Sequence, residues 1–259
     1  MKKIALTSLL AALAVSGAHA ANTIDGNPLY MSKANHFYSV TSLESHSENE
    51  SLWTLGEQFG YGISDKLAVE VSTTASEAHE FDYNSWNDVD LAVAFRALNK
   101  GAWKLDLIGA YGVDNVYPDH APFLKKELTM YGWTAGVRGG YTTARWTVAG
   151  HAYFTYGNTE SFNWDDEGAH IWNLGLDAQF VIDNNWNLVA GANYRGQTDD
   201  YVKNAGIWTG MFGVNYNIDA TKFVGAYVNG SMSHRHGANA DEWKSDDGFG
   251  FGAKFGIDF

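Results

Sequence analysis

Apolar and polar residues alternate along most of this chain. The clearest case is the segment 248–259, in which Phe249, Phe251 and Phe255 share one face with Ala253, while glycines and Lys254 occupy the other face. Successive side chains of a β-strand point to opposite faces, so this pattern predicts a strand, and one longer than most strands of soluble proteins. The same alternation predicts strands at 36–44, 51–62, 67–75, 88–98, 102–113, 127–141, 145–156, 169–182, 186–196, 206–218, 222–234 and 248–259.

Two architectures produce such alternation, and three features favour the one that spans a membrane. A soluble sandwich buries its apolar face, whereas a transmembrane barrel turns that face toward lipid. The segments reach the length of about ten residues that a tilted membrane strand needs. Their apolar faces often end in Trp, Tyr or Phe, as an interfacial girdle requires. Their polar faces are rich in Gly, Asn and Ser. We therefore expect an all-β fold, a transmembrane antiparallel up-and-down β-barrel of about 12 strands.

Short and long connections alternate between the expected strands. The short ones have the Asn, Asp, Gly and Ser chemistry of tight turns and lie at 63–66, 99–101, 142–144, 183–185 and 219–221. The long polar ones lie near 44–50, 76–87, 114–126, 157–168, 197–205 and 235–247. This order gives an even strand number. It places both termini of the chain on the side of the short turns, which we expect to be the periplasm.

The N-terminus has the layout of an export signal. Lys2 and Lys3 precede the apolar run 4–15, and the small residues Ala18 and Ala20 precede an expected cleavage after Ala20. The run is too short to span a membrane. We expect a signal peptide at 1–20, a periplasmic N-terminal extension at 21–34, and one barrel domain at 35–259.

Composition excludes several classes of function. The net charge is −13, which argues against nucleic-acid binding. The chain has no cysteine, so disulfides, thiolate metal sites and a cysteine nucleophile are excluded. No cofactor motif is present. Glycine-rich runs such as 248–252 lie in an expected strand with no helix after them, so they are not phosphate-binding loops.

One residue interrupts the apolar faces. In the expected strand 51–62, Glu57 falls between Leu55 and Phe59 on the face that should meet lipid. A β-bulge at this point, or a position at the rim of the barrel, would resolve the conflict.

The chain resembles the bacterial outer-membrane β-barrel proteins, most sharply in its last strand. That family ends in Phe with apolar residues at alternate positions before it, and Phe255, Ile257 and Phe259 match. Lys254 departs from the pattern, since the family often has glycine there. The turn at 62–67 resembles those of small transporter-type barrels, including the family connected with meta-pathway phenol degradation. The resemblance implies the outer membrane as location. It also implies that the barrel-assembly machinery reads the last strand, and that lipid and lipopolysaccharide surround the barrel.

Because inward and outward positions alternate along each strand, the pattern assigns a set of charged and polar residues to the lumen. Three acidic candidates are Glu70, Asp88 and Asp90. The interior is mixed in charge, so strong ion selectivity is not implied. The principal lumen-lining candidates are Arg96, Lys104, Asp106, Arg138, His151, Asp177, Arg195 and Lys254.

Three functions are compatible with such a barrel, and we rank them. The first is a passive, porin-like channel for small solutes. The second is a closed structural or interaction barrel whose acidic loops bind a surface partner or, through divalent cations, lipopolysaccharide phosphates. The third and weakest is a membrane hydrolase. His151 is followed by Ala-Tyr-Phe and departs from the His-x-Ser-Asn-Gly run of outer-membrane phospholipase A. We therefore expect no enzymatic activity.

A histidine pair near the last long loop is the other candidate for a chemical role. His234 and His236 precede several acidic residues, and imidazole with carboxylates can bind a transition metal. A solvated acidic loop explains the same residues, so we predict no metal site.

Overall fold

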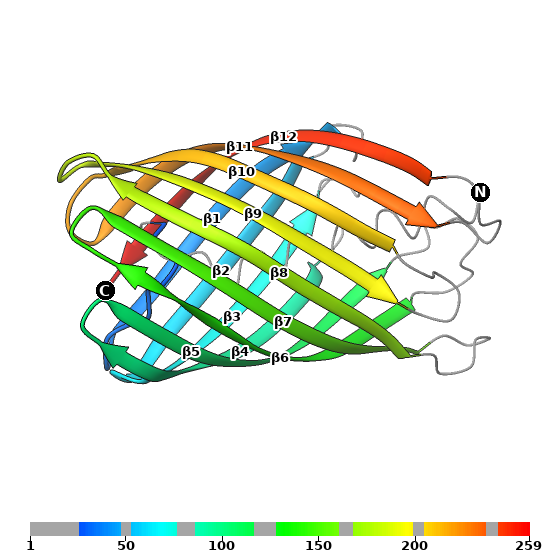
Figure 1. Cartoon of the computed structure of the whole chain (residues 1–259), viewed down its shortest axis with the longest axis horizontal. Helices are drawn as coiled ribbons and strands as arrows, with labels where there is room; N and C mark the ends of the chain where they lie inside the picture. The colour runs from blue at the N-terminus through cyan, green and yellow to red at the C-terminus, as the bar shows by residue number, and fades with distance from the viewer. Residues whose placement is uncertain are drawn as a thin grey trace.

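The computed structural model describes residues 26–47, 53–76, 86–116, 128–160, 168–198, 205–236 and 243–259. Within these ranges the chain forms a closed barrel of tilted strands (Figure 1). The expected signal peptide, 1–20, lies outside the described residues. The described residues contain no helix that is both long and apolar enough to cross a membrane. The strands are β1 (Phe37–His46), β2 (Trp53–Ser64), β3 (Leu67–Ser76), β4 (Trp86–Lys100), β5 (Trp103–Val116), β6 (Leu128–Thr142), β7 (Trp146–Glu160), β8 (Gly168–Val181), β9 (Trp186–Thr198), β10 (Ala205–Asn217), β11 (Lys222–His236) and β12 (Trp243–Asp258).

Every strand pairs antiparallel with its neighbours in sequence, and β1 pairs with β12 to close the barrel. The predicted fold class and the strand count of 12 are therefore confirmed. Closure leaves no free strand edge, which is what a sheet requires when no water is present to satisfy its backbone. Several strands are longer than predicted at the end that carries the long loops. For example, β12 begins at Trp243 instead of residue 248. Beyond the apolar band the outer residues need not be apolar, so alternation no longer marks the strand.

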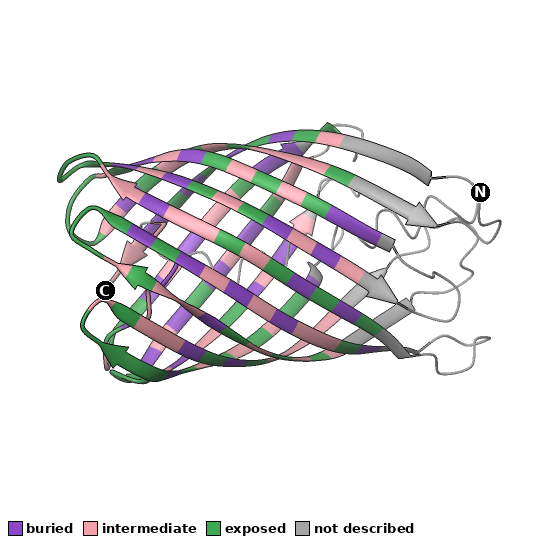
Figure 2. Ribbon diagram, in the orientation of Figure 1, coloured by how far each residue is buried: buried purple, intermediate pink, exposed green. Residues whose placement is uncertain are grey.

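The two faces of the sheet differ in the way that a membrane barrel requires. Outward side chains are mostly apolar and exposed, and inward ones are mostly polar and buried, so exposure alternates along each strand (Figure 2). Aromatic pairs lie near the ends of the outer face. Trp103 contacts Tyr141 near the short turns, with ring centroids 5.0 Å apart, and Tyr111 contacts Trp133 farther along, at 4.6 Å. These pairs have the chemistry of the interfacial girdles of membrane barrels.

Local irregularities occur at bulges, but not at the position where the sequence suggested one. The β4–β5 register shifts between Arg96 and Leu98, and this shift allows both Phe95 and Leu98 to point outward. Around Glu57 the pairing of β2 with β1 and with β3 is continuous from residue 54 to residue 61. The expectation of a bulge at Glu57 was therefore wrong.

The rim alternative for Glu57 is wrong as well. On the outer face of β2, Glu57 lies midway between Trp53 and Tyr61, not at either end of the strand. Its surroundings are described below, because a carboxylate on the apolar face of the barrel requires an explanation.

Candidate functional site: the barrel lumen

Large inward side chains lie against the wall of the barrel and not across it. Tyr153 on β7 is paired directly with Gly136 on β6, and Tyr227 on β11 with Gly252 on β12. At both glycines, an added Cβ would collide with the facing tyrosine ring. The missing side chain therefore provides the space in which each ring lies flat on the neighbouring strand.

Glycines of the neighbouring strand also make room for polar side chains of the interior. Asp90 lies over Gly112, and His151 lies over Gly175, in each case the residue directly opposite in the neighbouring strand. These groups therefore fold back onto the neighbouring strand of the wall. The many glycines on the polar faces of the strands are visible in the sequence. Which side chain each glycine accommodates depends on the strand register, which the sequence pattern does not give.

An ion cluster lies near the short-turn end of the lumen. Asp106 on β5 is fully buried and accepts hydrogen bonds from two arginines. Arg96 on β4 donates from Nε to Oδ1 at 2.6 Å and from Nη2 to Oδ2 at 3.0 Å. Arg138 on β6 donates to Oδ2 from Nε at 3.1 Å and from Nη2 at 2.8 Å. One carboxylate on β5 thus binds two guanidinium groups, one from each of the strands that flank β5. With two arginines and one aspartate, the cluster carries a net positive charge.

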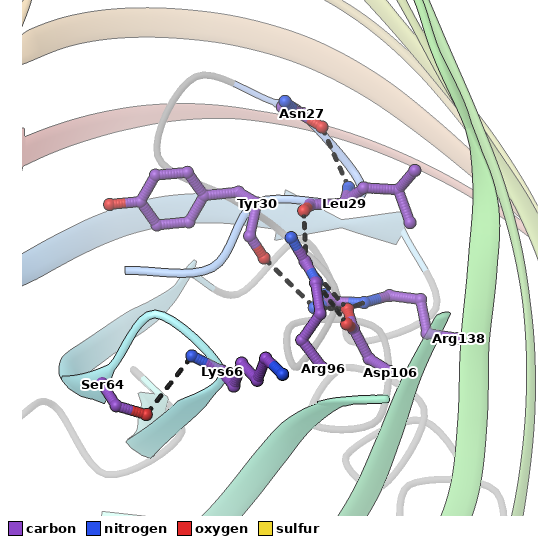
Figure 3. A network of polar contacts seen from close by, with 8 residues as sticks. All are labelled: Asn27, Leu29, Tyr30, Ser64, Lys66, Arg96, Asp106 and Arg138. Carbon is purple, nitrogen blue, oxygen red and sulfur yellow. Dashed lines mark hydrogen bonds and ion pairs between the residues drawn. The ribbon is translucent and has the colours of Figure 1, made fainter. Parts of the chain in front are cut away.

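Both arginines also bind a segment that precedes the first strand. Arg96 Nη2 donates to the carbonyl of Leu29 at 2.8 Å, and Arg138 Nη2 donates to the carbonyl of Tyr30 at 3.1 Å (Figure 3). Tyr30 also packs edge-on against Tyr38, with centroids 5.6 Å apart. The side chain of Leu29 is fully buried. This segment is therefore held by both polar and apolar contacts.

We call residues 26–35 the strap, because their contacts reach several sides of the barrel. At one end, Gly26 lies close enough to Val189 on β9 and Asn215 on β10 that an added Cβ would collide with both side chains. At the other end, the amide of Asn35 donates to the carbonyl of Gly62 on β2 at 2.7 Å. The strap therefore crosses the lumen near the short turns. Its residues up to 34 belong to the region in which we expected a periplasmic extension.

His151 is held between strands by hydrogen-bonding groups. Its Nδ1 lies 3.2 Å from Oδ2 of Asp177, and its Nε2 lies 3.0 Å from Oδ1 of Asn173 and 3.2 Å from Oδ1 of Asn193. The ring also stacks on Tyr153, with centroids 4.9 Å apart. A general base needs one ring nitrogen available to a nucleophile. Here both nitrogens face oxygen atoms of the wall, an arrangement that suits a structural ion pair.

The remaining candidates are distributed along the interior and do not form a single cluster. The ammonium group of Lys254 lies 5.8 Å from the ring centroid of Phe223 and 5.9 Å from that of Tyr227. Arg195 is buried on β9, and Lys104 is half-buried on β5 near the short-turn end. All of these side chains occupy the inward positions of their strands. Their part in transport stays a prediction.

Sequence reasoning missed Glu44, and it missed the partner of Glu70, which it had assigned to the lumen. Glu44 on β1 accepts a hydrogen bond from the hydroxyl of Tyr227 at 2.9 Å, and Glu70 on β3 accepts one from the hydroxyl of Tyr38. Parity alone cannot reveal such contacts, because they join residues of different strands. No group of three or more potential metal ligands occurs among the described residues. The candidate loop beyond His236 lies largely outside them.

Comparison with known proteins places the fold among the outer-membrane barrels. No protein-family model matches the sequence, and a search of curated proteins found no match. Among solved structures, the NanC porin is 12% identical, with a TM-score of 0.54 over 83% of this chain and 98% of that one.

Two further structures are similar. The translocator domain of the autotransporter NalP from Neisseria meningitidis is 11% identical, with a TM-score of 0.57 over 96% of this chain and 97% of that one. The KdgM porin, solved with disordered oligogalacturonate, is 7% identical, with a TM-score of 0.51 over 86% of this chain and 99% of that one. The chain thus has the fold of the bacterial outer-membrane β-barrels.

Proposed function

We propose that the chain is a passive channel for small solutes in the bacterial outer membrane, narrowed at its periplasmic end by the strap. The arrangement of the inward side chains carries this proposal. Tyr153, Tyr227, Asp90 and His151 lie against glycines of the wall, and in this proposal the axis of the barrel stays open to small solutes. A barrel of about twelve strands lies between filled small barrels and wide porins, so its openness depends on such packing.

Charge along the lumen sets the selectivity in this proposal. The cluster around Asp106 is positive, whereas Glu44, Glu70 and Asp177 add negative groups on other strands. A mixed interior favours weak selectivity over the recognition of one ion. The two porins among the similar structures support a channel, and no enzymatic role is proposed. Phe255, Ile257 and Phe259 serve assembly in the outer membrane after export by the signal peptide.

One observation favours a second candidate, a closed structural barrel. The strap crosses the lumen and is fixed by Arg96 and Arg138, so its contacts could block the path of a solute. In this alternative, the acidic outer loops bind a surface partner and nothing passes through the barrel.

Single-channel recording distinguishes the two candidates. Protein extracted from outer membranes, shown to be folded by its heat-modifiable migration on gels, is added to a planar lipid bilayer. The channel proposal expects discrete conductance steps from the wild-type protein. If the wild-type protein is silent and only a variant lacking residues 27–33 conducts, the closed barrel is correct and the passive channel is refuted.

A charge reversal in the lumen tests whether the steps come from this pore. Lys104→Glu places a negative charge at an inward position, and we expect the reversal potential in a salt gradient to move toward cation selectivity. Lys100→Glu is the matched control, because Lys100 is exposed at the end of β4 beside a short turn. Equal shifts from both variants, or a shift from neither, would contradict the assignment of Lys104 to the conducting path.

A further inference from the structure

The ion cluster around Asp106 leaves one amino group of each arginine without a partner. Arg96 and Arg138 bind Asp106 and the strap through Nε and Nη2 alone. The Nη1 amino group of each arginine donates no hydrogen bond to any residue that the structure describes. A guanidinium group has five N–H donors, and two of these belong to Nη1. Both arginines therefore retain donors for a ligand.

The two Nη1 nitrogens border open space although their side chains are buried. The side chains of Arg96 and Arg138 are each 6% exposed. Among the described residues, the fully enclosed polar atoms that lack a hydrogen-bond partner include Tyr153 Oη and Asn229 Oδ1, but neither Nη1 nitrogen. Because both arginines occupy inward positions, a nitrogen that is neither bonded nor enclosed faces the interior of the barrel. A solute in the lumen can therefore reach these donors.

Lys104 brings a third positive charge to the same part of the lumen. It lies two residues before Asp106 on β5, on the same inward face and about 7 Å away along the strand. Its ammonium group forms no hydrogen bond or ion pair with the residues that the structure describes, and its side chain is half-buried. Lys104 is close enough to Arg96 for the two charges to repel each other.

Positive charge exceeds negative charge in this part of the lumen. Arg96, Arg138 and Lys104 contribute three cations, whereas Asp106 contributes one carboxylate. Glu70 on β3 is a second carboxylate that interacts electrostatically with Arg138. When both carboxylates are counted, one positive charge still lacks an anion. Buried charge without a counter-charge is costly, so this arrangement favours a ligand that carries one negative charge.

We propose that Arg96, Arg138 and Lys104 form a binding site for an oxyanion, namely the carboxylate or phosphate group of a solute. The planar Nη1 amino groups donate to oxygen acceptors in fixed directions, and the ammonium group of Lys104 adds a point charge. The carbonyls of Leu29 and Tyr30 occupy Nη2 of the two arginines and leave Nη1 open. The site therefore lies beside the strap. The inference rests on the proposed function in one respect, that an anionic solute reaches the site through the lumen.

The site affects transport at one level of the lumen. A solute that carries an oxyanion pauses beside the strap, whereas a neutral solute of the same size passes without a binding step. Glu44 on β1 and Asp177 on β8 keep the rest of the interior mixed in charge. One anion site is therefore compatible with the weak ion selectivity of the whole channel.

Ligand-dependent unfolding tests the site without a conductance measurement. The folded barrel in lipid vesicles is unfolded with urea in sodium acetate, in sodium phosphate and in sodium chloride, at equal ionic strength and neutral pH. A ligand that binds only the folded barrel raises the unfolding midpoint. At about ten times its dissociation constant, acetate or phosphate should raise the midpoint by about 0.5 M urea above its value in chloride. The probe that acts distinguishes a carboxylate ligand from a phosphate ligand.

Three variants assign the effect to this site. Lys104→Met removes the unpaired ammonium group and should weaken binding about tenfold, which reduces the shift to about 0.1 M urea. Arg138→Lys keeps the charge but lacks Nη1, and its shift, measured against its own midpoint in chloride, should fall as well. Lys100→Met is the matched control, because Lys100 is exposed at the end of β4, and it should keep the full shift.

The outcomes separate this site from the channel proposal. The site is refuted if acetate and phosphate stabilise the barrel no more than chloride does, if Lys104→Met keeps the full shift, or if both lysine variants lose it equally. Conductance steps without anion-dependent stability would refute the site and leave the channel. Anion-dependent stability in a protein that is silent in planar bilayers would refute the channel and leave the site.

Discussion

Asp106 provides the sharpest test of the interior, through the substitution Asp106→Asn. The side chain keeps its size, but the negative charge that holds two guanidinium groups is removed. In the native protein Asp106 is fully buried, and the side chains of Arg96 and Arg138 are each 6% exposed. The asparagine keeps one acceptor oxygen and turns an N–H2 group toward one of the arginines. The two buried positive charges then lack an anion.

The magnitude follows from the burial of the cluster. Breaking a buried ion pair by removing one partner costs about 3–5 kcal/mol, because the remaining charge is desolvated without compensation. Given a dependence on urea of about 3 kcal/mol per molar, the midpoint of unfolding should fall by roughly 1–1.7 M. Asp65→Asn is the control, since Asp65 lies exposed in a short turn, and it should change the free energy of unfolding by less than about 0.5 kcal/mol.

The assay is reversible urea unfolding in lipid vesicles, followed by tryptophan fluorescence and by the shift on gels. A double-mutant cycle with Arg138→Met adds a second criterion. The arginine substitution should cost less in the Asp106→Asn protein than in the wild type, because the pair is already broken. If Asp106→Asn is within about 1 kcal/mol of the wild type, the cluster is solvated and the reasoning from burial fails.

The glycines of the barrel support further expectations, all read from the same unfolding measurement. Gly136→Ala should destabilise the barrel by about 1–3 kcal/mol, because its methyl group collides with Tyr153, whereas Gly109→Ala, whose nearest neighbouring atom is 4.0 Å away, should be nearly neutral. Equal effects of the two would show that the ring does not rest on the glycine. Gly101→Ala should cost about 1–2 kcal/mol from backbone strain alone, since φ is +59° and nothing lies within 4 Å of the added Cβ. An unchanged stability would mean that the turn adopts another conformation.

Strand number and side-chain faces were predictable because the membrane imposes a strict rule. Lipid accepts apolar side chains on one face, and every residue of the opposite face turns inward, so parity assigned Arg96, Asp106 and Arg138 to the inside before any pairing was known. Pairing depends on the stagger between neighbouring strands. The contact of Tyr153 with Gly136, for example, follows from the β6–β7 register, which alternation does not encode.

The strap and Glu57 are two features that the alternation of apolar and polar residues could not predict. Residues 26–35 have no alternation, so nothing indicated that Leu29 and Tyr30 would present carbonyls to buried arginines. Glu57 broke the alternation, and neither a bulge nor a rim position explains it. The structure keeps the residue on the outer face at mid-strand, where Ser39 and Thr41 donate hydrogen bonds to its carboxylate, and this contact depends on the register of β1 against β2.

The size limit for solute flux tests the central claim, that the lumen is continuous and is narrowed by the strap. Proteoliposomes with the folded wild-type protein are compared with proteoliposomes of the variant lacking residues 27–33, using neutral sugars of increasing length. The account predicts that the wild type admits only the smaller sugars and that the deletion raises the limit. Flux that is absent from both folded proteins, or a limit that the deletion leaves unchanged, would contradict it.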